Sequence, residues 1–131
     1  MKIVSVRILI ADDFEAWRLQ VRTLLRPQKE WEIVSEAQDG LEAVQNASEF
    51  HPDVVLMDIG MPVLNGMAAA AQIRQLSPNS KIIFLTVNSS PEVINIALNT
   101  VAAGYVLKAK ARRELIPAIE EVVRGQPVSP P

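Results

Sequence analysis

The chain has 131 residues, of which 49% are hydrophobic and 21% charged, and its formal net charge at pH 7 is −2. This length predicts one domain whose core needs no disulfide or metal to hold it together. The chain has no cysteine, which excludes a disulfide framework, a thiol nucleophile and a cysteine zinc site and favours a reducing, cytoplasmic compartment. The mildly acidic balance lacks the basic footprint of nucleic-acid binding, and no apolar run approaches the ~20 residues of a membrane span.

Short apolar, β-branched runs alternate with segments of helical length along the chain. We expect strands at Val6–Ala11, Trp31–Ala37, Val54–Met57, Lys81–Thr86 and Gly104–Leu107. Strands that are apolar on both faces predict a parallel sheet covered by helices on both sides. A closed barrel needs eight strands and about 250 residues. The sequence therefore predicts an α/β fold, an open doubly wound five-stranded sheet of flavodoxin-like (βα)5 type with strand order 2-1-3-4-5.

The segments between the strands carry apolar residues at helical spacing. Their expected inward faces are Trp17, Val21, Leu24 and Leu25; Leu41 and Val44; Ile73 and Leu76; Ile94, Ala97, Leu98 and Val101; and Leu115, Ile119 and Val122. Ser90 is the expected N-cap of the fourth helix, with Pro91 at its first position. Pro117 lies within the fifth helical pattern, so that helix either starts late, near Glu114, or is kinked at the proline.

The last residues set the expected domain boundary. Residues 1–125 are predicted to form one domain, whereas residues 126–131 contain three prolines and cannot continue the fifth helix. We expect residues 126–131 to be the start of a linker or a C-terminal tail.

Two strands end in carboxylates. Asp12 and Asp13 follow the first strand, and Asp58 follows the most apolar run of the chain. Because parallel strands present their carboxyl ends at one edge of a sheet, the three carboxylates should meet there, where open α/β folds bind ligands. Oxygen ligands without histidine or cysteine favour a hard cation, with Mg²⁺ first.

Two further polar side chains end the neighbouring strands at the same edge. Thr86 brings a hydroxyl to the end of the fourth strand, and Lys108 brings an ammonium to the end of the fifth. A metal, a nucleophilic carboxylate, a hydroxyl and a lysine together favour phosphoryl transfer.

In this order the motifs resemble the receiver domain of bacterial two-component response regulators over about the whole chain. The motifs are Asp12-Asp13, Asp58 followed by Met61-Pro62 and Asn65-Gly66, Thr86, and Gly104-Tyr105-Val106-Leu107-Lys108. The resemblance implies that Asp58 accepts a phosphoryl group from a histidine kinase. It also implies that Asp12, Asp13, Asp58 and the backbone carbonyl of Gly60 hold Mg²⁺, with Asp12 acting partly through water.

The resemblance further implies a conformational switch. Thr86 and Lys108 would contact the phosphoryl oxygens, and Tyr105 would turn inward on activation. The surface of the fourth helix, fifth strand and fifth helix would then change and meet a partner or a second copy of the chain.

A narrower resemblance is to the nitrate-response class, the NarL/FixJ-like receivers. It rests on Ala109 after the lysine, Leu64-Asn65-Gly66, and the run from Glu114 to Ile119. Such receivers usually precede a helix-turn-helix domain, which implies control of transcription through a DNA-binding domain absent from this chain. Two positions depart from the family pattern: Val101 stands where glycine usually ends the fourth helix, and Val87 is bulkier than the usual small residue.

Other functions remain open from the residues alone. One is a stand-alone receiver that acts by protein–protein contact, and another is a binding module that has kept the fold without the chemistry. The third is an aspartate-nucleophile phosphatase of the haloacid-dehalogenase type, which normally carries a second aspartate two residues after the first. Gly60 occupies that position, so we expect no enzyme activity beyond the domain's own phosphorylation and dephosphorylation.

Overall fold

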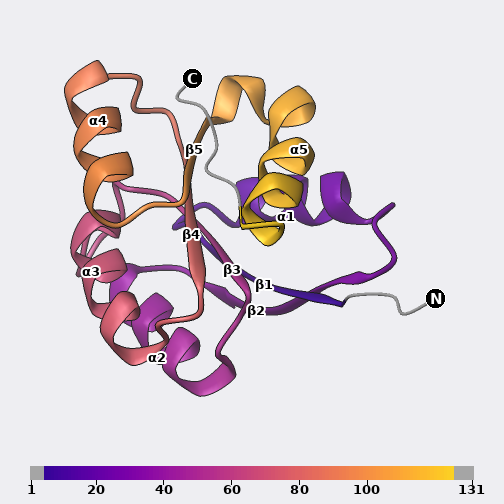
Figure 1. Cartoon of the computed structure of the whole chain (residues 1–131), viewed down its shortest axis with the longest axis horizontal. Coiled ribbons are helices and arrows are strands. Elements are labelled where there is room, and N and C mark those ends of the chain that lie inside the picture. The colour runs from indigo at the N-terminus through magenta and orange to yellow at the C-terminus, as the bar shows by residue number, and fades with distance from the viewer. Residues whose placement is uncertain (1–4, 126–131) are drawn as a thin grey trace.

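The computed structural model describes residues 5–125 as a five-stranded parallel sheet flanked by helices (Figure 1). The strands are β1 (Val6–Ala11), β2 (Trp31–Ala37), β3 (Val54–Met57), β4 (Lys81–Thr86) and β5 (Gly104–Leu107). Their order is β2-β1-β3-β4-β5, and every adjacent pair is parallel. The predicted strands and the open, doubly wound topology are therefore confirmed. The expected linker at 126–131 lies outside the described residues.

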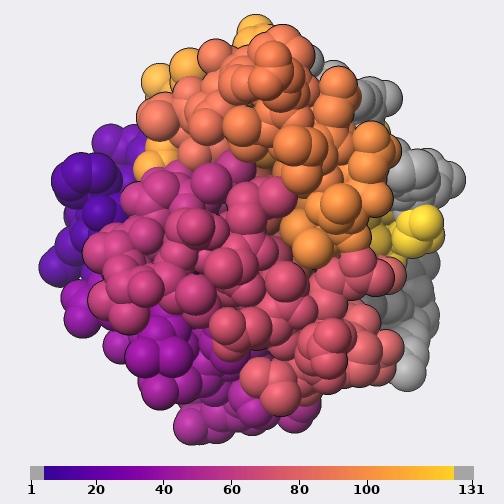
Figure 2. All heavy atoms as spheres, turned by 90° about the vertical axis from the view of Figure 1, so that its left-hand side faces the viewer, coloured from indigo at the N-terminus to yellow at the C-terminus, as the bar shows by residue number. Residues whose placement is uncertain are grey.

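Helices cover both faces of the sheet. They are α1 (Glu15–Leu25), α2 (Gly40–Phe50), α3 (Gly66–Leu76), α4 (Pro91–Thr100) and α5 (Ala111–Val123), with a short 3-10 turn, η1, at Lys108–Lys110. Helices α1 and α5 pack on one face, and α2, α3 and α4 pack on the other. Figure 2 views the second face, with α4 in orange above α3. Within residues 5–125 no helix has both the length and the hydropathy to cross a membrane.

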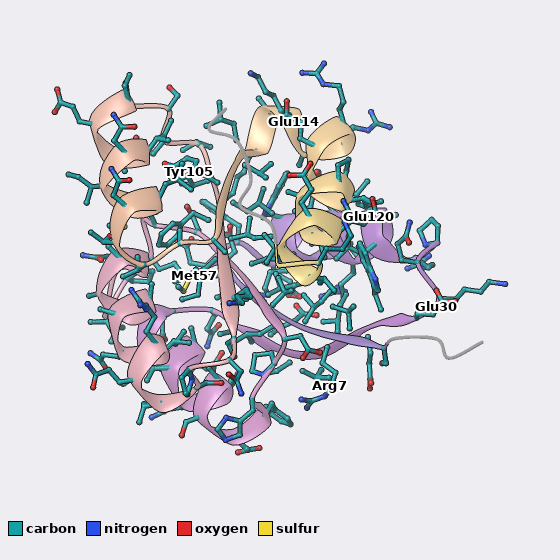
Figure 3. All side chains as sticks on the ribbon, in the orientation of Figure 1. Arg7, Glu30, Met57, Tyr105, Glu114 and Glu120 are labelled. Carbon is teal, nitrogen blue, oxygen red and sulfur yellow. The ribbon has the colours of Figure 1, made fainter. Side chains whose placement is uncertain are left out.

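The strands bury side chains on both faces because alternate residues point to opposite helical layers. In β1, Leu9 belongs to the core beneath α2–α4, whereas Ile8 and Ile10 belong to the core beneath α1 and α5. Met57 at the end of β3 lies on the α2–α4 side, as does Tyr105 of β5 (Figure 3). With both faces covered by helices, the carboxyl ends of the strands are the expected place for a ligand.

Side-chain caps mark where α2 and α4 begin. The Asp39 carboxylate accepts the N–H of Glu42 at 2.8 Å to start α2, and the Ser90 hydroxyl accepts the N–H of Val93 at 3.5 Å to start α4. The predicted start of α4 is confirmed. Helix α4 does not end in the left-handed conformation that a C-terminal glycine usually adopts, since Val101 at its C-cap has φ −124°.

Three sequence expectations about the helices were wrong. Leu41 and Leu76 are 46% and 49% exposed, because they lie in the first turn of α2 and at the last residue of α3, where the helical stripe turns away from the sheet. Of the two alternatives for α5, the late start near Glu114 is wrong, since the helix begins at Ala111 and runs through Pro117. Pro117 faces solvent, so its missing N–H leaves no unpaired group in the core.

Candidate functional site

The register of β1 and β3 places Asp12 beside Asp58. Ala11 and Met57 are paired residues, so the next residue of each strand leaves the sheet at the same point. The backbone N–H of Asp58 donates to Ala11 at 3.0 Å, and the N–H of Asp12 donates to Ala37 at 3.0 Å. Both carboxylates are thus anchored by sheet hydrogen bonds and point out of the carboxyl edge.

Three carboxylates gather there, as the sequence predicted. Asp12, Asp13 and Asp58 each offer an oxygen, and these oxygens lie within 4.8 Å of one another. Asp12 and Asp58 are buried, at 2% and 8% exposure, whereas Asp13 is exposed. One oxygen of each buried carboxylate accepts a backbone N–H, from Phe14 at 2.9 Å and from Ile59 at 2.8 Å. The second oxygen of each is left for the centre of the cluster.

Lys108 supplies the cation that faces these oxygens. Its Nζ lies 2.7 Å from Oδ2 of Asp12 and 3.3 Å from Oδ2 of Asp58. The shorter contact is poorly directed, because Oδ2 of Asp12 is buried and makes no geometrically proper hydrogen bond within the described chain. The contact is an ion pair. The lysine and both aspartates predicted from sequence therefore meet at one point.

The charge of the buried Asp12 carboxylate is only partly stabilised by its neighbours. Burial raises the pKa of the Asp12 carboxyl above its usual value, and the nearby charge of Asp58 adds to the rise. Lys108 and the N–H of Phe14 act in the opposite direction and do not cancel the effect of burial. A buried oxygen without a proper donor, in a set made only of oxygen ligands, fits Mg²⁺.

The loop after β3 is held close against Asp58. The carbonyl of Ile59 accepts two N–H groups, from Met61 at 3.0 Å and from Gly66 at 2.7 Å. A Cβ on Gly66 would lie 2.1 Å from the backbone oxygen of Asp58, so only glycine fits there. Val63 has φ +68°, and Leu64 donates to Pro62 at 2.7 Å across it. This strained three-residue turn closes the loop that carries Gly60.

Thr86 and Tyr105 both contact the backbone of Asn88. Thr86 is 2% exposed, and its hydroxyl accepts the N–H of Asn88 at a long 3.4 Å. Tyr105 is 1% exposed, donates its hydroxyl to the carbonyl of Asn88 at 2.7 Å, and packs edge-on against Phe84. The ring therefore already occupies the inward position that we expected it to reach on activation. A switching role for Thr86 and Tyr105 stays a prediction.

Two α1 residues near the site were missed by the sequence reasoning. Arg18 donates to the backbone carbonyl of Asp12 at 2.6 Å and to Glu36 of β2 at 3.0 Å, which braces the acidic loop. Trp17, expected only to pack, has its ring 5.1 Å from Nζ of Lys108. The sequence offered one indication of these contacts: both residues lie in the first turn of α1, shortly after Asp13.

Exposed apolar side chains lie in the loops that follow β1, β3 and β4. Phe14, Val63 and Val87 are 66%, 77% and 77% exposed, and each lies in a loop at the carboxyl edge. Val87, bulkier than the usual residue at its position, is thus largely exposed to solvent. The only histidine, His51, precedes β3 at the opposite edge of the sheet and has no place in this site.

Comparison with known proteins gives a consistent result. The family model described as "Response regulator receiver domain" matches residues 8–120. The transcriptional regulatory protein DegU of Brevibacillus brevis is 35% identical over 92% of this chain and 51% of its own. The chain therefore spans about half the length of that curated relative.

Solved structures agree with this match. The signal receiver domain of a response regulator named NarL, from Mycobacterium tuberculosis, is 29% identical with a TM-score of 0.88, covering 95% of this chain and all of that one. A DNA-binding response regulator of the LuxR family from Staphylococcus aureus is 30% identical with a TM-score of 0.83, covering 90% of this chain and 98% of that one. Both likenesses extend over nearly the whole described fold.

Proposed function

The chain belongs to the response regulator receiver domain family, and from this premise we propose that Asp58 is its phosphoryl acceptor, supplied by a histidine kinase. The observation that supports this most is the meeting of Asp12, Asp58 and Lys108 at one sheet edge, with Nζ of Lys108 2.7 and 3.3 Å from the two carboxylates. Asp58 is the only one of the three aspartates at the end of the central strand β3.

In the proposed transfer, an oxygen of the Asp58 carboxylate bonds to the phosphorus of a phosphohistidine. The bond from phosphorus to the imidazole nitrogen breaks, and the nitrogen leaves with the electron pair and takes up a proton from solvent. In this proposal the hydroxyl of Thr86 and the ammonium of Lys108 would contact the phosphoryl oxygens, which would lower the energy of the charge that develops on them.

A divalent cation would be held by Asp12, Asp13, Asp58 and the backbone carbonyl of Gly60. When bound, Mg²⁺ supplies positive charge that offsets the repulsion between the carboxylates and the incoming phosphoryl group. The buried oxygen of Asp12, which Lys108 approaches without proper hydrogen-bond direction, is the structural reason for this assignment.

The output that we propose is control of transcription through a separate DNA-binding domain. Support comes from the names of the relatives, one a transcriptional regulatory protein and another a DNA-binding response regulator. Such an output places the protein in the cytoplasm, where bacterial DNA lies. The α4–β5–α5 surface would carry the signal, to a partner or to a second copy of the chain.

Turnover of external substrates is not part of this proposal. A phosphatase built on an aspartate nucleophile needs a proton donor near the leaving group, and Gly60 stands two residues after Asp58 without a side chain. The domain would therefore catalyse only the gain and loss of its own phosphoryl group.

Incubation with acetyl phosphate and Mg²⁺ tests these alternatives together. A covalent adduct with the mass of one phosphoryl group, mapped to Asp58, is the expected result. Steady release of phosphate without an adduct would favour a phosphatase, and no reaction at all would favour a binding module.

A further inference from the structure

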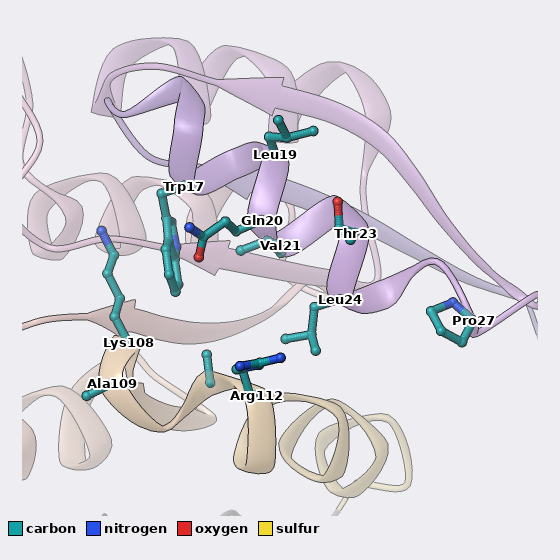
Figure 4. A pocket seen from close by; sticks show the side chains of 11 residues that line it. Trp17, Leu19, Gln20, Val21, Thr23, Leu24, Pro27, Lys108, Ala109 and Arg112 are labelled. Atoms are coloured by element: carbon teal, nitrogen blue, oxygen red, sulfur yellow. The ribbon is translucent and has the colours of Figure 1, made fainter.

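Lys108 has a third neighbour besides the two carboxylates. Its Nζ lies 5.1 Å from the ring centroid of Trp17, and its side chain is only 12% exposed. Trp17 is the third residue of α1, whereas Lys108 follows β5. Figure 4 shows the Trp17 ring beside the side chain of Lys108. The contact thus joins two elements that are far apart in the sequence.

Trp17 also forms part of the wall of a groove between α1 and the start of α5. The groove has a volume of about 760 Å³ and is lined by Val21, Leu24, Ala111 and Arg112 as well as by Trp17 and Lys108 (Figure 4). A lysine side chain has four flexible methylene groups. If the ring were absent, the ammonium could turn into this groove and away from Asp58.

The attraction of the Trp17 ring for the Lys108 ammonium differs in kind from the ionic attraction of the two carboxylates for the same group. An ammonium over the face of tryptophan is held by the ring quadrupole, more strongly where water is excluded. Asp12 and Asp58 are both proposed ligands of a cation, and when their oxygens serve a metal they are less available to Lys108. Trp17 has no such second use, so its hold on the lysine does not depend on the state of the carboxylates.

We propose that Trp17 is a positioning residue that keeps the Lys108 ammonium at Asp58 during phosphorylation. This inference rests on the proposed function, in which Lys108 contacts the phosphoryl oxygens. The proposed effect of Trp17 on the phosphorylation rate requires Lys108. A purely structural role of Trp17 in packing would affect the rate whether or not Lys108 is present.

The test is the rate of phosphorylation by acetyl phosphate, a donor too small to involve contacts of α1 with a kinase. In this reaction an Asp58 oxygen bonds to phosphorus while acetate leaves with the electron pair of the broken P–O bond. Trp17→Leu should lower the rate roughly 3- to 30-fold, the range that corresponds to loss of one cation–π contact. Trp17→Phe keeps a ring and should recover most of the rate.

Two comparisons separate positioning from packing. In a Lys108→Met background, Trp17→Leu should cause no further loss, because the group it positions is gone. Trp31→Leu, the same change at the other, partly buried tryptophan, should leave the rate within about twofold of wild type. Additive losses in the double variant, or no recovery in Trp17→Phe, would overturn the inference.

A spectroscopic readout covers the case in which Trp17→Leu does not fold. In Trp31→Phe protein, Trp17 is the sole tryptophan, and beryllofluoride with Mg²⁺ should change its emission in the presence of Lys108 and not in Lys108→Met. An equal change in both would overturn the inference alone. Absence of any adduct on wild type would overturn the proposed function, and this inference with it.

Discussion

Tyr105 donates its hydroxyl to the backbone carbonyl of Asn88 at 2.7 Å, while the N–H of that same Asn88 points at Thr86. The peptide groups of one loop residue therefore link the end of β4 to the ring on β5. Any displacement of Thr86 toward Asp58 would pull on the N–H of Asn88, and through its carbonyl on Tyr105. This connection gives the α4 side of the sheet a route by which it could sense the acidic site.

The first prediction concerns ionisation of Tyr105. Burial raises the pKa of its phenol above the ordinary value of about 10, and the negative charge of Asp58 adds to the rise. Because the chain has a single tyrosine, near-ultraviolet absorbance of tyrosinate reports this group alone. The folded protein should ionise above pH 10. Asp58→Asn should lower that pKa partway, since burial remains.

The raised pKa of Tyr105 also makes the stability of the folded protein depend on pH. The folded state holds the phenolic proton more tightly than the unfolded state, so the stability involved is fully present below pH 10 and is lost as pH rises through the folded pKa. Wild type should thus lose more stability above pH 10 than Tyr105→Phe does. A folded-state titration at or below pH 10 would contradict this.

The second prediction is the effect of Asp58→Asn. The variant should take up no phosphoryl group from acetyl phosphate and should keep its stability within about 1 kcal/mol without metal. Removing one carboxylate lowers repulsion in the cluster, and Lys108 keeps its partner Asp12 at 2.7 Å. Mass spectrometry and denaturant unfolding check the two parts.

Asp53→Asn is the matched control for that experiment. Asp53 is exposed and precedes β3, at the end of the strand opposite to Asp58. This variant should be phosphorylated like wild type. A phosphoryl group found on Asp13 of the Asp58→Asn protein would show that the acceptor is wrongly assigned.

The third prediction is stabilisation by Mg²⁺. Linkage gives about 2.7 kcal/mol when the free ion is at 100 times its dissociation constant. The gain in melting temperature should shrink sharply in Asp13→Ala and persist in Glu120→Ala, an exposed carboxylate on α5. A wild-type melting temperature that does not respond to tens of millimolar Mg²⁺, far above physiological need, would argue against a metal site.

Much of this could be predicted from the sequence, for identifiable reasons. The strands are short apolar runs bounded by loop residues, and parallel topology alone brings Asp12, Asp58 and Lys108 to one edge. The contact of Trp17 with Lys108 could not be predicted, because it depends on how α1 leans toward β5. The inward position of Tyr105 depends likewise on the backbone conformation of the loop at Asn88. The spacing of apolar residues in the sequence does not predict that conformation.

The fourth prediction concerns Gly66, the first residue of α3. Gly66→Ala would place a Cβ 2.1 Å from the Asp58 carbonyl oxygen and 2.8 Å from Cα of Ile59. Both contacts are with backbone, which cannot move aside without shifting the acceptor, so the variant should lose roughly 1–3 kcal/mol or more. Gly60→Ala is the control for stability, since its Cβ would meet nothing within 4 Å. Equal unfolding midpoints for the two variants would contradict the steric argument.

The last prediction concerns how phosphorylation of Asp58 becomes a change of surface. A charge-assisted hydrogen bond contributes about 1.5–3 kcal/mol net, whereas moving a population from 1:99 to 99:1 requires about 5.5 kcal/mol of preference. One contact, from Thr86 or from Lys108, is therefore insufficient, and the two together only just suffice. Thr86→Ala should leave phosphorylation largely intact and give a partial switch, and Lys108→Ala should uncouple it more severely.

NMR with beryllofluoride and Mg²⁺ measures that switch along the chain. In wild type, chemical-shift changes should extend from Asn88 through α4 to Tyr105, because the Asn88 backbone is hydrogen-bonded to both Thr86 and Tyr105. Thr86→Ala should reduce them while keeping the shifts next to Asp58, and Thr23→Ala, at an exposed position on α1, should behave as wild type. Full-size shifts from Asn88 to Tyr105 in Thr86→Ala would mean that the signal leaves the site by another route. The strained loop at Val63, which follows Asp58 in the chain, would then be the next element to test.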